Sequence, residues 1–95
     1  MQWDLKQDMT MASMPDIVSQ YRGKFPKKGA WSIDCHQVAH TDSAGVAWLL
    51  SCVKHAAQHK MALEIKGLSA STCALIDAHG LTSLFSSYCK DVANG

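Results

Sequence analysis

The sequence predicts a small α/β domain, because segments that favour β-strands are separated by segments with helical periodicity. At three places along the chain, apolar residues alternate with polar ones, as they do in half-buried strands. Between those places, apolar residues recur every three or four positions, as on the buried face of an amphipathic helix. Strands and helices that alternate in this way form a mainly parallel sheet with right-handed crossovers.

The first expected strand is Gln2 to Lys6, where Trp3 and Leu5 alternate with polar residues. The residues from Asp8 to Ala12 are expected to form a turn. Ser13 then has the side chain of a helix N-cap. The helix that follows has apolar residues at i, i+3, i+4 and i+7, which predicts a buried face of Met14, Ile17, Val18 and Tyr21.

A basic loop is expected to join this helix to the second strand. Gly23 favours the end of the helix, because glycine readily adopts the left-handed conformation found there. The loop contains one aromatic residue, Phe25, and its cations are Arg22, Lys24, Lys27 and Lys28. We expect these cations only to keep the turn solvated. The second strand is expected at Trp31 to Cys35.

The longest expected helix runs from Ser43 to Lys60. Its apolar residues form one stripe, which comprises Val46, Leu49, Leu50, Val53 and Ala57. The segment from Ala62 to Lys66 alternates again and is the third expected strand, with Gly67 directly after it.

Two further helices are expected towards the C-terminus. The first is capped by Ser69 or Ser71 and ends at Gly80. The second, LTSLFSSYCKDV, covers residues 81–92, and its apolar face comprises Leu81, Leu84, Phe85 and Tyr88. The chain therefore predicts one domain, residues 1–95, with a small sheet of about three to four strands and about four helices.

Charge and hydropathy exclude several classes of function. A net charge of +1 gives no electrostatic footprint for nucleic acid or for an acidic membrane surface. The longest apolar run, Val46 to Leu50, is far shorter than the roughly 20 residues that span a bilayer. The first residues, MQWDLKQD, contain no apolar signal-peptide core. We therefore expect a soluble cytoplasmic protein whose four cysteines, Cys35, Cys52, Cys73 and Cys89, are reduced thiols.

The stretch HTDSAGVAWLL, His40 to Leu50, contains the strongest candidate site. Asp42 or Ser43 can cap the helix that begins here, because the oxygens of both side chains accept free backbone N–H groups. A hydroxyl at this position would also be exposed and close to the positive end of the helix. A phosphate on Ser43 would be favoured by the helix end and opposed by Asp42 and Asp34.

The stretch IDCHQVAHTDSAGVAWLL resembles the signature of the STAS domain family. Asp34, Asp42, Ser43, Gly45 and the run 46–50 fall at that family's spacing. The resemblance covers residues 30–85, and it implies a STAS-like α/β fold. The family usually has two strands at the N-terminus, whereas this chain has room for one, so the resemblance implies that an N-terminal edge strand is missing.

The resemblance also implies a non-enzymatic module that binds a partner protein. The implied contact surface comprises Asp42, Ser43, Ala44, Gly45, Val46 and Ala47, with Asp42, Ser43, Val46 and Ala47 presented to the partner. The form Asp-Ser-Ala-Gly and the chain length are more similar to the STAS subunits of Mla-type phospholipid ABC transporters, whose partner is the ATPase subunit. Such a complex would hold the chain at the inner face of the inner membrane.

A second branch of the family provides the alternative. In anti-sigma-factor antagonists, the Ser or Thr after the Asp is phosphorylated by an anti-sigma-factor kinase, which makes Ser43 a possible phosphorylation site. Another Ser or Thr usually precedes the glycine in that branch, and here that position is Ala44.

Catalysis and metal binding find little support in the sequence. A catalytic triad could be drawn from Ser43, His40 and Asp42, but no GxSxG motif is present and the three lie too close in sequence for one element to orient another. We expect no enzymatic activity and no cofactor. The group Cys35, His36 and His40 and the pair His55 and His59 each supply fewer ligands than a structural zinc ion needs, so no biological metal site is expected. The two histidines of the pair are expected on a solvated helix face.

Overall fold

The computed structural model describes residues 1–90 and contains one parallel sheet. Its strands are β1 (Gln2–Asp4), β2 (Ala30–Asp34), β3 (Ala62–Lys66) and β4 (Cys89–Lys90), and they lie side by side in chain order. All three strand pairs are parallel. The α/β class and the first three strands are thus confirmed. A single strand precedes β2 in the sequence, and it forms one edge of the sheet.

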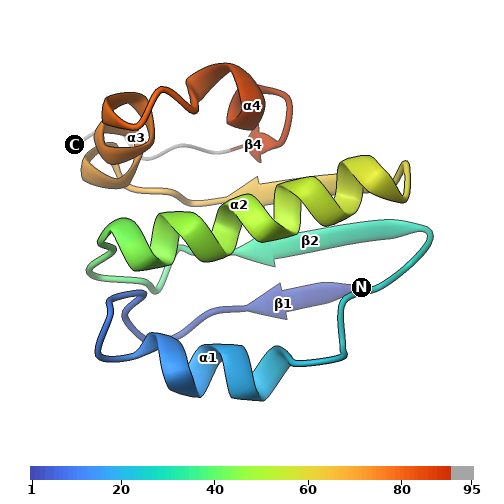
Figure 1. Cartoon of the computed structure of the whole chain (residues 1–95), viewed down its shortest axis with the longest axis horizontal. Coiled ribbons are helices and arrows are strands. Elements are labelled where there is room, and N and C mark those ends of the chain that lie inside the picture. The colour runs from blue at the N-terminus through green and yellow to red at the C-terminus, as the bar shows by residue number, and fades with distance from the viewer. Residues whose placement is uncertain (91–95) are drawn as a thin grey trace.

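Four helices connect and follow these strands: α1 (Met14–Tyr21), α2 (Ser43–Gln58), α3 (Ala70–Ala78) and α4 (Thr82–Ser86). Figure 1 shows α2 crossing in front of the middle of the sheet, with α1 beside β1 and with α3 and α4 beside β4. Each connection leads to the next strand in the same direction, so right-handed crossovers place the helices on the same face.

The burial of the strand residues agrees with this two-layer arrangement. In the first three strands, alternate side chains face the helices and are buried, namely Trp3, Trp31, Ile33, Leu63 and Ile65. The side chains between them are polar or small, and they are exposed or half-buried. The sheet therefore has one covered face and one polar face.

Aromatic side chains fill the core between α1, α2 and the first two strands. Trp3 stacks on Tyr21 with ring centroids 4.2 Å apart, and it meets Trp31 edge-on at 5.0 Å. Trp48 of α2 lies 5.8 Å from Tyr21, and Phe25 lies 5.2 Å from Trp31. This cluster fixes α2 against α1 and the sheet, because large rings pack with few alternative arrangements.

The buried face of α2 is rotated from the expected stripe. Val46, Leu49 and Val53 are buried as expected, but Leu50 is half-buried and Ala57 is exposed. The other buried side chains on this helix are Trp48, Cys52 and Ala56. The aromatic cluster takes up Trp48, so the buried arc extends towards α1 and leaves Leu50 at the boundary with solvent.

Smaller corrections apply to α1 and to the end of the chain. Val18 is 38% exposed, although Met14, Ile17 and Tyr21 are buried as expected. Ser13 occupies the N-cap position of α1, but its side chain makes no capping hydrogen bond.

The last helix ends at Ser86 instead of continuing to residue 92. Leu84 is 50% exposed, and the chain then enters β4. There the carbonyl of Tyr88 accepts a hydrogen bond from the amide of Ile65. A neighbouring strand thus overrides the helical pattern of this segment; positions 91 and 92 lie outside the described residues.

Candidate functional site

The start of α2 is held in place by Asp42, which is its N-cap. Its Oδ1 accepts hydrogen bonds from the amides of Ala44 at 2.9 Å and Gly45 at 3.3 Å. Its Oδ2 accepts a third from the amide of Met11 at 2.8 Å. These bonds, that from Met11 foremost, hold the pKa of Asp42 below its ordinary value. Of the two capping residues that the sequence allows, Asp42 therefore performs this role.

Gly45 allows the segments that contain Met9 and Thr41 to pack closely against the first turn of α2. Met9 pairs with Thr41 in an isolated bridge, and the amide of Asp42 donates to the carbonyl of Met9 at 3.1 Å. A Cβ atom on Gly45 would overlap that carbonyl and would lie 2.8 Å from both Met9 Cβ and Thr41 Cγ2. Glycine is thus required here for space, and this explains its place in the DSAG sequence.

Ser43 is exposed, and its hydroxyl faces the end of α3. Its Oγ lies 3.1 Å from Nε2 of His79, which is the C-cap residue of α3. Next to this pair is a shallow groove of about 260 Å³ between α2 and the α3–α4 connection. The groove is lined by Ser43, Val46, Ala47, Leu50, His79 and Leu81.

The residues expected at the contact surface differ widely in exposure. Ser43 and Ala47 are exposed, whereas Asp42 and Ala44 are half-buried. Gly45 is buried, and so is Val46, which is only 2% exposed. The expectation that Val46 is presented to a partner is therefore wrong: it packs in the core and reaches only the floor of the groove.

Three residues that line this groove were not expected at the contact surface from the sequence: Leu50, His79 and Leu81. Leu50 lies one helical turn beyond Ala47, at the edge of the apolar stripe of α2. Helical spacing alone could therefore have placed it beside the expected contact surface. His79 and Leu81 come from a distant segment, and nothing in the local pattern connects them with Ser43. Only the packing of α3 and α4 against α2 brings them there.

The Ser43–His79 pair does not form a complete catalytic triad. His79, and not His40, is the imidazole beside Ser43. Among the hydrogen bonds of the described residues, none joins the His79 ring to a carboxylate. The carboxylate of Asp42 is occupied by three backbone amides. The pair therefore lacks the carboxylate that orients the imidazole in a catalytic triad.

Asp34 is hydrogen-bonded to His36, two residues further along the chain. Oδ1 of Asp34 accepts from the amide of His36 at 2.9 Å and lies 2.7 Å from Nδ1 of the same residue. These two bonds hold the pKa of Asp34 below its ordinary value. The ring of His36 lies over Gly67, where a Cβ atom would fall 2.6 Å from Nδ1.

The cysteines and histidines do not converge on a metal. Within residues 1–90, no three metal-binding side chains lie together. All four cysteines are free thiols, as expected. Burial raises the pKa of Cys35 to about 12 and that of Cys89 to about 11, so both are protonated near neutral pH and unreactive as nucleophiles.

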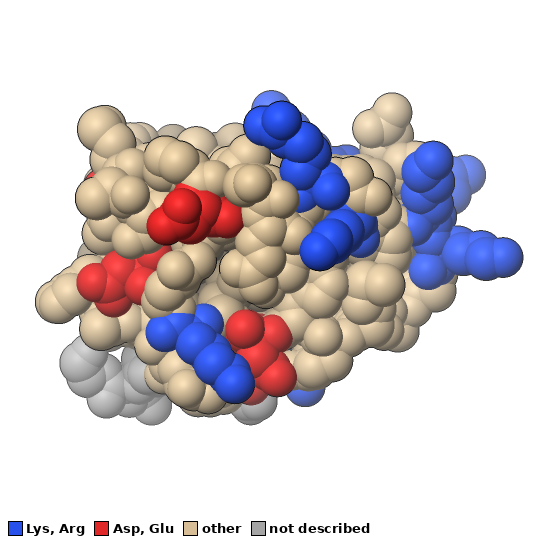
Figure 2. Space-filling view, turned by 90° about the horizontal axis from the view of Figure 1, so that it is seen from below, with Lys and Arg blue, Asp and Glu red and all other residues tan. Residues whose placement is uncertain are grey.

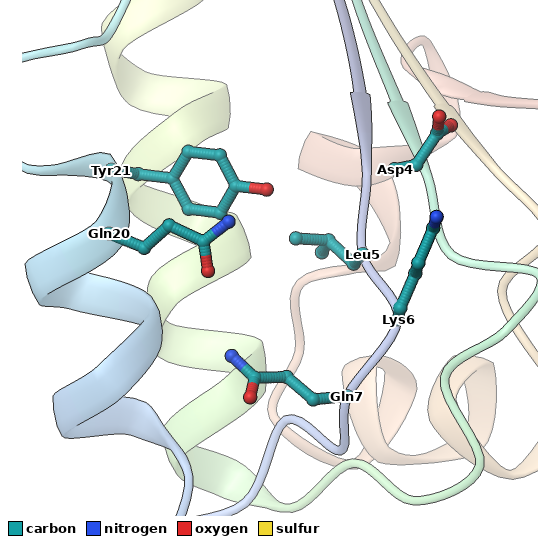
Figure 3. Close-up of a pocket in the computed structure, with 6 residues that line it drawn as sticks. All are labelled: Asp4, Leu5, Lys6, Gln7, Gln20 and Tyr21. Atoms are coloured by element: carbon teal, nitrogen blue, oxygen red, sulfur yellow. The ribbon is translucent and has the colours of Figure 1, made fainter.

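A second hollow, of about 250 Å³, lies between the end of β1 and α1. Figure 3 shows Tyr21 and Gln20 extending from α1 towards β1, with Leu5 pointing back towards Tyr21. Burial, with the charge of Asp4, raises the pKa of Tyr21. Asp4 and Lys6 also line this hollow. The start of α2 remains the better candidate for a partner surface, because an exposed hydroxyl is positioned there at a capped helix end.

The cap of α2 should be sensitive to acid. The pKa of Asp42 is lowered in the folded chain, so its stabilising contribution is complete above the ordinary value of about 3.9 and is lost as the pH falls through the folded value. Asp42→Asn keeps a capping oxygen but does not titrate. We expect the melting temperature of this variant to fall less than that of the natural chain between neutral pH and about pH 2.

Asp16→Asn is the matched control, since Asp16 is an exposed acid in the first turn of α1. Thermal denaturation followed by circular dichroism would measure all three proteins. Identical acid profiles for the natural chain and Asp42→Asn would show that the hydrogen bonds of Asp42 do not stabilise the fold.

Comparisons with known proteins agree with this architecture. A family model described as "Mlab, STAS domain" matches residues 3–86. The crystal structure of a sulfate transporter family protein from Wolinella succinogenes is similar, with a TM-score of 0.69 at 14% sequence identity. The alignment covers 96% of this chain and 75% of that one. No curated protein matches the sequence. Among the described helices, none is both long and apolar enough to cross a bilayer.

Proposed function

The chain belongs to the STAS domain family of the MlaB type, and from that premise we propose that it is a non-enzymatic regulatory subunit that binds the ATPase of an Mla-type phospholipid ABC transporter. It would act in the cytoplasm, held by its partner at the inner face of the inner membrane. The proposal requires no cofactor.

The observation that best supports a binding role is the fixed position of the exposed Ser43 hydroxyl. Asp42 holds the first turn of α2 by three hydrogen bonds, and His79 lies 3.1 Å from Ser43 Oγ. A polar pair beside a shallow groove with Ala47, Leu50 and Leu81 in its walls offers both apolar contact and directed hydrogen bonds. Such a surface is already ordered before a partner arrives, which lowers the entropic cost of binding.

Regulation by this surface follows from differential affinity. A small module that binds one conformation of an ATPase more tightly than another shifts the ATPase towards the first conformation. No chemistry on the module is needed for this effect.

Ser43→Asp tests the surface. A carboxylate here can still be accommodated at the positive end of α2, so the stability should change little. It would bring a second negative charge beside Asp42 and into the contact, where an unpaired charge is costly to desolvate. We expect binding to the co-encoded ATPase subunit, measured by calorimetry, to weaken at least about tenfold, or roughly 1.4 kcal/mol.

Ser71→Asp is the matched control. Ser71 lies in the first turn of α3, at the end opposite to His79, so this variant should bind normally. If Ser43→Asp folds and binds with unchanged affinity, the start of α2 is not the contact. If the natural chain does not bind the ATPase subunit at all, the proposed partner is wrong.

The exposed hydroxyl also allows a second candidate function. Ser43 is accessible to a kinase, so the chain could be an anti-sigma-factor antagonist that is switched by phosphorylation. Incubation with a co-encoded anti-sigma-factor kinase and labelled ATP would then label the natural chain but not Ser43→Ala. The MlaB description of the matching family model favours the transporter role over this one.

A further inference from the structure

Another groove, separate from the hollow beside β1, lies on the opposite side of α2, where this helix faces α1. Its volume is about 500 Å³. Its walls include Val18, Tyr21, Phe25, Trp48 and His55, with Arg22 beside them. The groove at Ser43 is separate, and its lining shares no residue with this one.

The aromatic walls of this groove are held in fixed positions. Phe25 meets Trp48 edge-on with centroids 6.2 Å apart, and it meets His55 edge-on at 5.2 Å. Tyr21 and Trp48 are each 8% exposed to solvent, whereas Val18 is 38% exposed. The groove thus presents a rigid apolar hollow with an accessible aliphatic side chain at its edge.

The basic loop is anchored next to the hollow by His55. Nε2 of His55 lies 2.6 Å from the carbonyl of Pro26, to which it donates a hydrogen bond. The amide of Lys24 donates to the carbonyl of Tyr21 at 3.0 Å, and Gly23 adopts a φ of 71°. The expectation of a solvated histidine pair is therefore wrong, since His55 and His59 are half-buried with ring centroids 4.3 Å apart.

The charge beside the groove is positive and not compensated. No carboxylate occurs between Asp16 and Asp34, and this segment contains the exposed cations Arg22, Lys24, Lys27 and Lys28. None of these four forms an ion pair within the described part of the chain. Figure 2 shows Lys and Arg side chains gathered towards one end of the face that includes α1 and β1. A chain with a net charge of +1 thus has a strongly basic end.

We propose that this basic aromatic groove binds an acidic amphipathic segment of a partner protein. One large apolar side chain of the segment lies in the groove over Trp48, beside Val18 and Phe25. The carboxylates of the segment pair with Arg22 and Lys24. Tyrosine, tryptophan and arginine are the residues that most often dominate binding energy at protein interfaces. The basic loop would also attract an acidic segment during its approach.

The shape of the site favours a polypeptide over a membrane surface. A concave hollow between two helices accepts a single protruding side chain, whereas the headgroup layer of a bilayer remains largely flat. The loop cations alone would suit either partner, so the hollow decides between them.

Selection from a library of random short peptides, displayed on phage and applied to the whole chain, tests this proposal. We expect the selected peptides to carry Leu, Phe or Trp close to Asp or Glu. By fluorescence anisotropy, Arg22→Glu should weaken binding of these peptides at least about fivefold. Lys66→Glu, a charge reversal at the end of β3, where Lys66 pairs with Glu64, should alter it less than about twofold. Val18→Asp should also weaken binding, because it places a carboxylate at the mouth of the hollow.

Other outcomes would overturn the proposal. Peptides without acidic residues, or affinities that Arg22→Glu and Val18→Asp leave unchanged, would exclude an acidic segment. No selected peptide, together with binding to phosphatidylglycerol-containing vesicles that Arg22→Glu abolishes, would assign the loop to an anionic membrane. These measurements do not involve the ATPase, and Ser43→Asp should leave peptide binding intact, so they stand apart from the test of the proposed function.

Discussion

Leu49→Ala is expected to lower the free energy of unfolding by about 2–5 kcal/mol, whereas Leu50→Ala should cost clearly less. Leu49 has no exposed surface and lies in the middle of α2, between the helix and the sheet. Its truncation removes buried methyl groups and leaves a cavity that the rigid aromatic cluster cannot fill. Leu50 is half-buried at the edge of the Ser43 groove, so water can reach the space that its truncation opens.

The two variants are a matched pair, because they make the same chemical change at adjacent positions of one helix. Urea denaturation would give, for each variant, the free energy of unfolding and its dependence on urea concentration. Equal losses would show that the buried arc of α2 is centred between the two leucines, as the original stripe implies. A greater loss for Leu50→Ala would contradict the helix phase described above.

Gly45→Ala is expected to destabilise the chain by about 3 kcal/mol, which is opposite to the usual effect of this change in a helix. Alanine generally favours helix by up to about 1 kcal/mol over glycine. At Gly45 the added methyl group would overlap the carbonyl of Met9, and that carbonyl is fixed by its hydrogen bond from Asp42. The steric cost exceeds the gain because backbone, unlike a flexible side chain, cannot move aside.

Gly80→Ala provides the comparison for this variant. A Cβ atom there would meet nothing within 4 Å, so only its φ of 70° opposes the change, at about 1–2 kcal/mol. Thermal and urea denaturation would measure both. A Gly45→Ala variant as stable as the natural chain would show that Met9 and Thr41 are not packed tightly under α2.

Much of the fold could be predicted because local pattern and tertiary environment agree. The bounds of β3 are those expected, since its alternation of apolar and polar residues matches one covered and one open face. The start of α2 was also found, because Asp and Ser before an apolar run form a strong capping signal. Strand β4 could not be predicted, because Leu81, Leu84 and Phe85 follow a helical period. A strand of two residues is also too short to show an alternation of apolar and polar side chains.

The candidate site could be predicted only in part. Sequence identified Asp42 and Ser43, which belong to one local motif. It could not identify His79, which approaches Ser43 through the packing of α3 on α2. It also treated the basic loop and His55 as solvated, because the hydrogen bond from His55 to Pro26 joins residues from two separate elements.

The order of the strands has a consequence for how the chain is made. Each strand pairs with the one that follows it in the sequence, so no strand has to wait for a partner synthesised much later. On a ribosome, β1, α1 and β2 can associate while α2 is still emerging, and each later strand adds to an edge that already exists. Growth of the sheet from β1 towards β4 therefore follows the order in which the ribosome synthesises the strands.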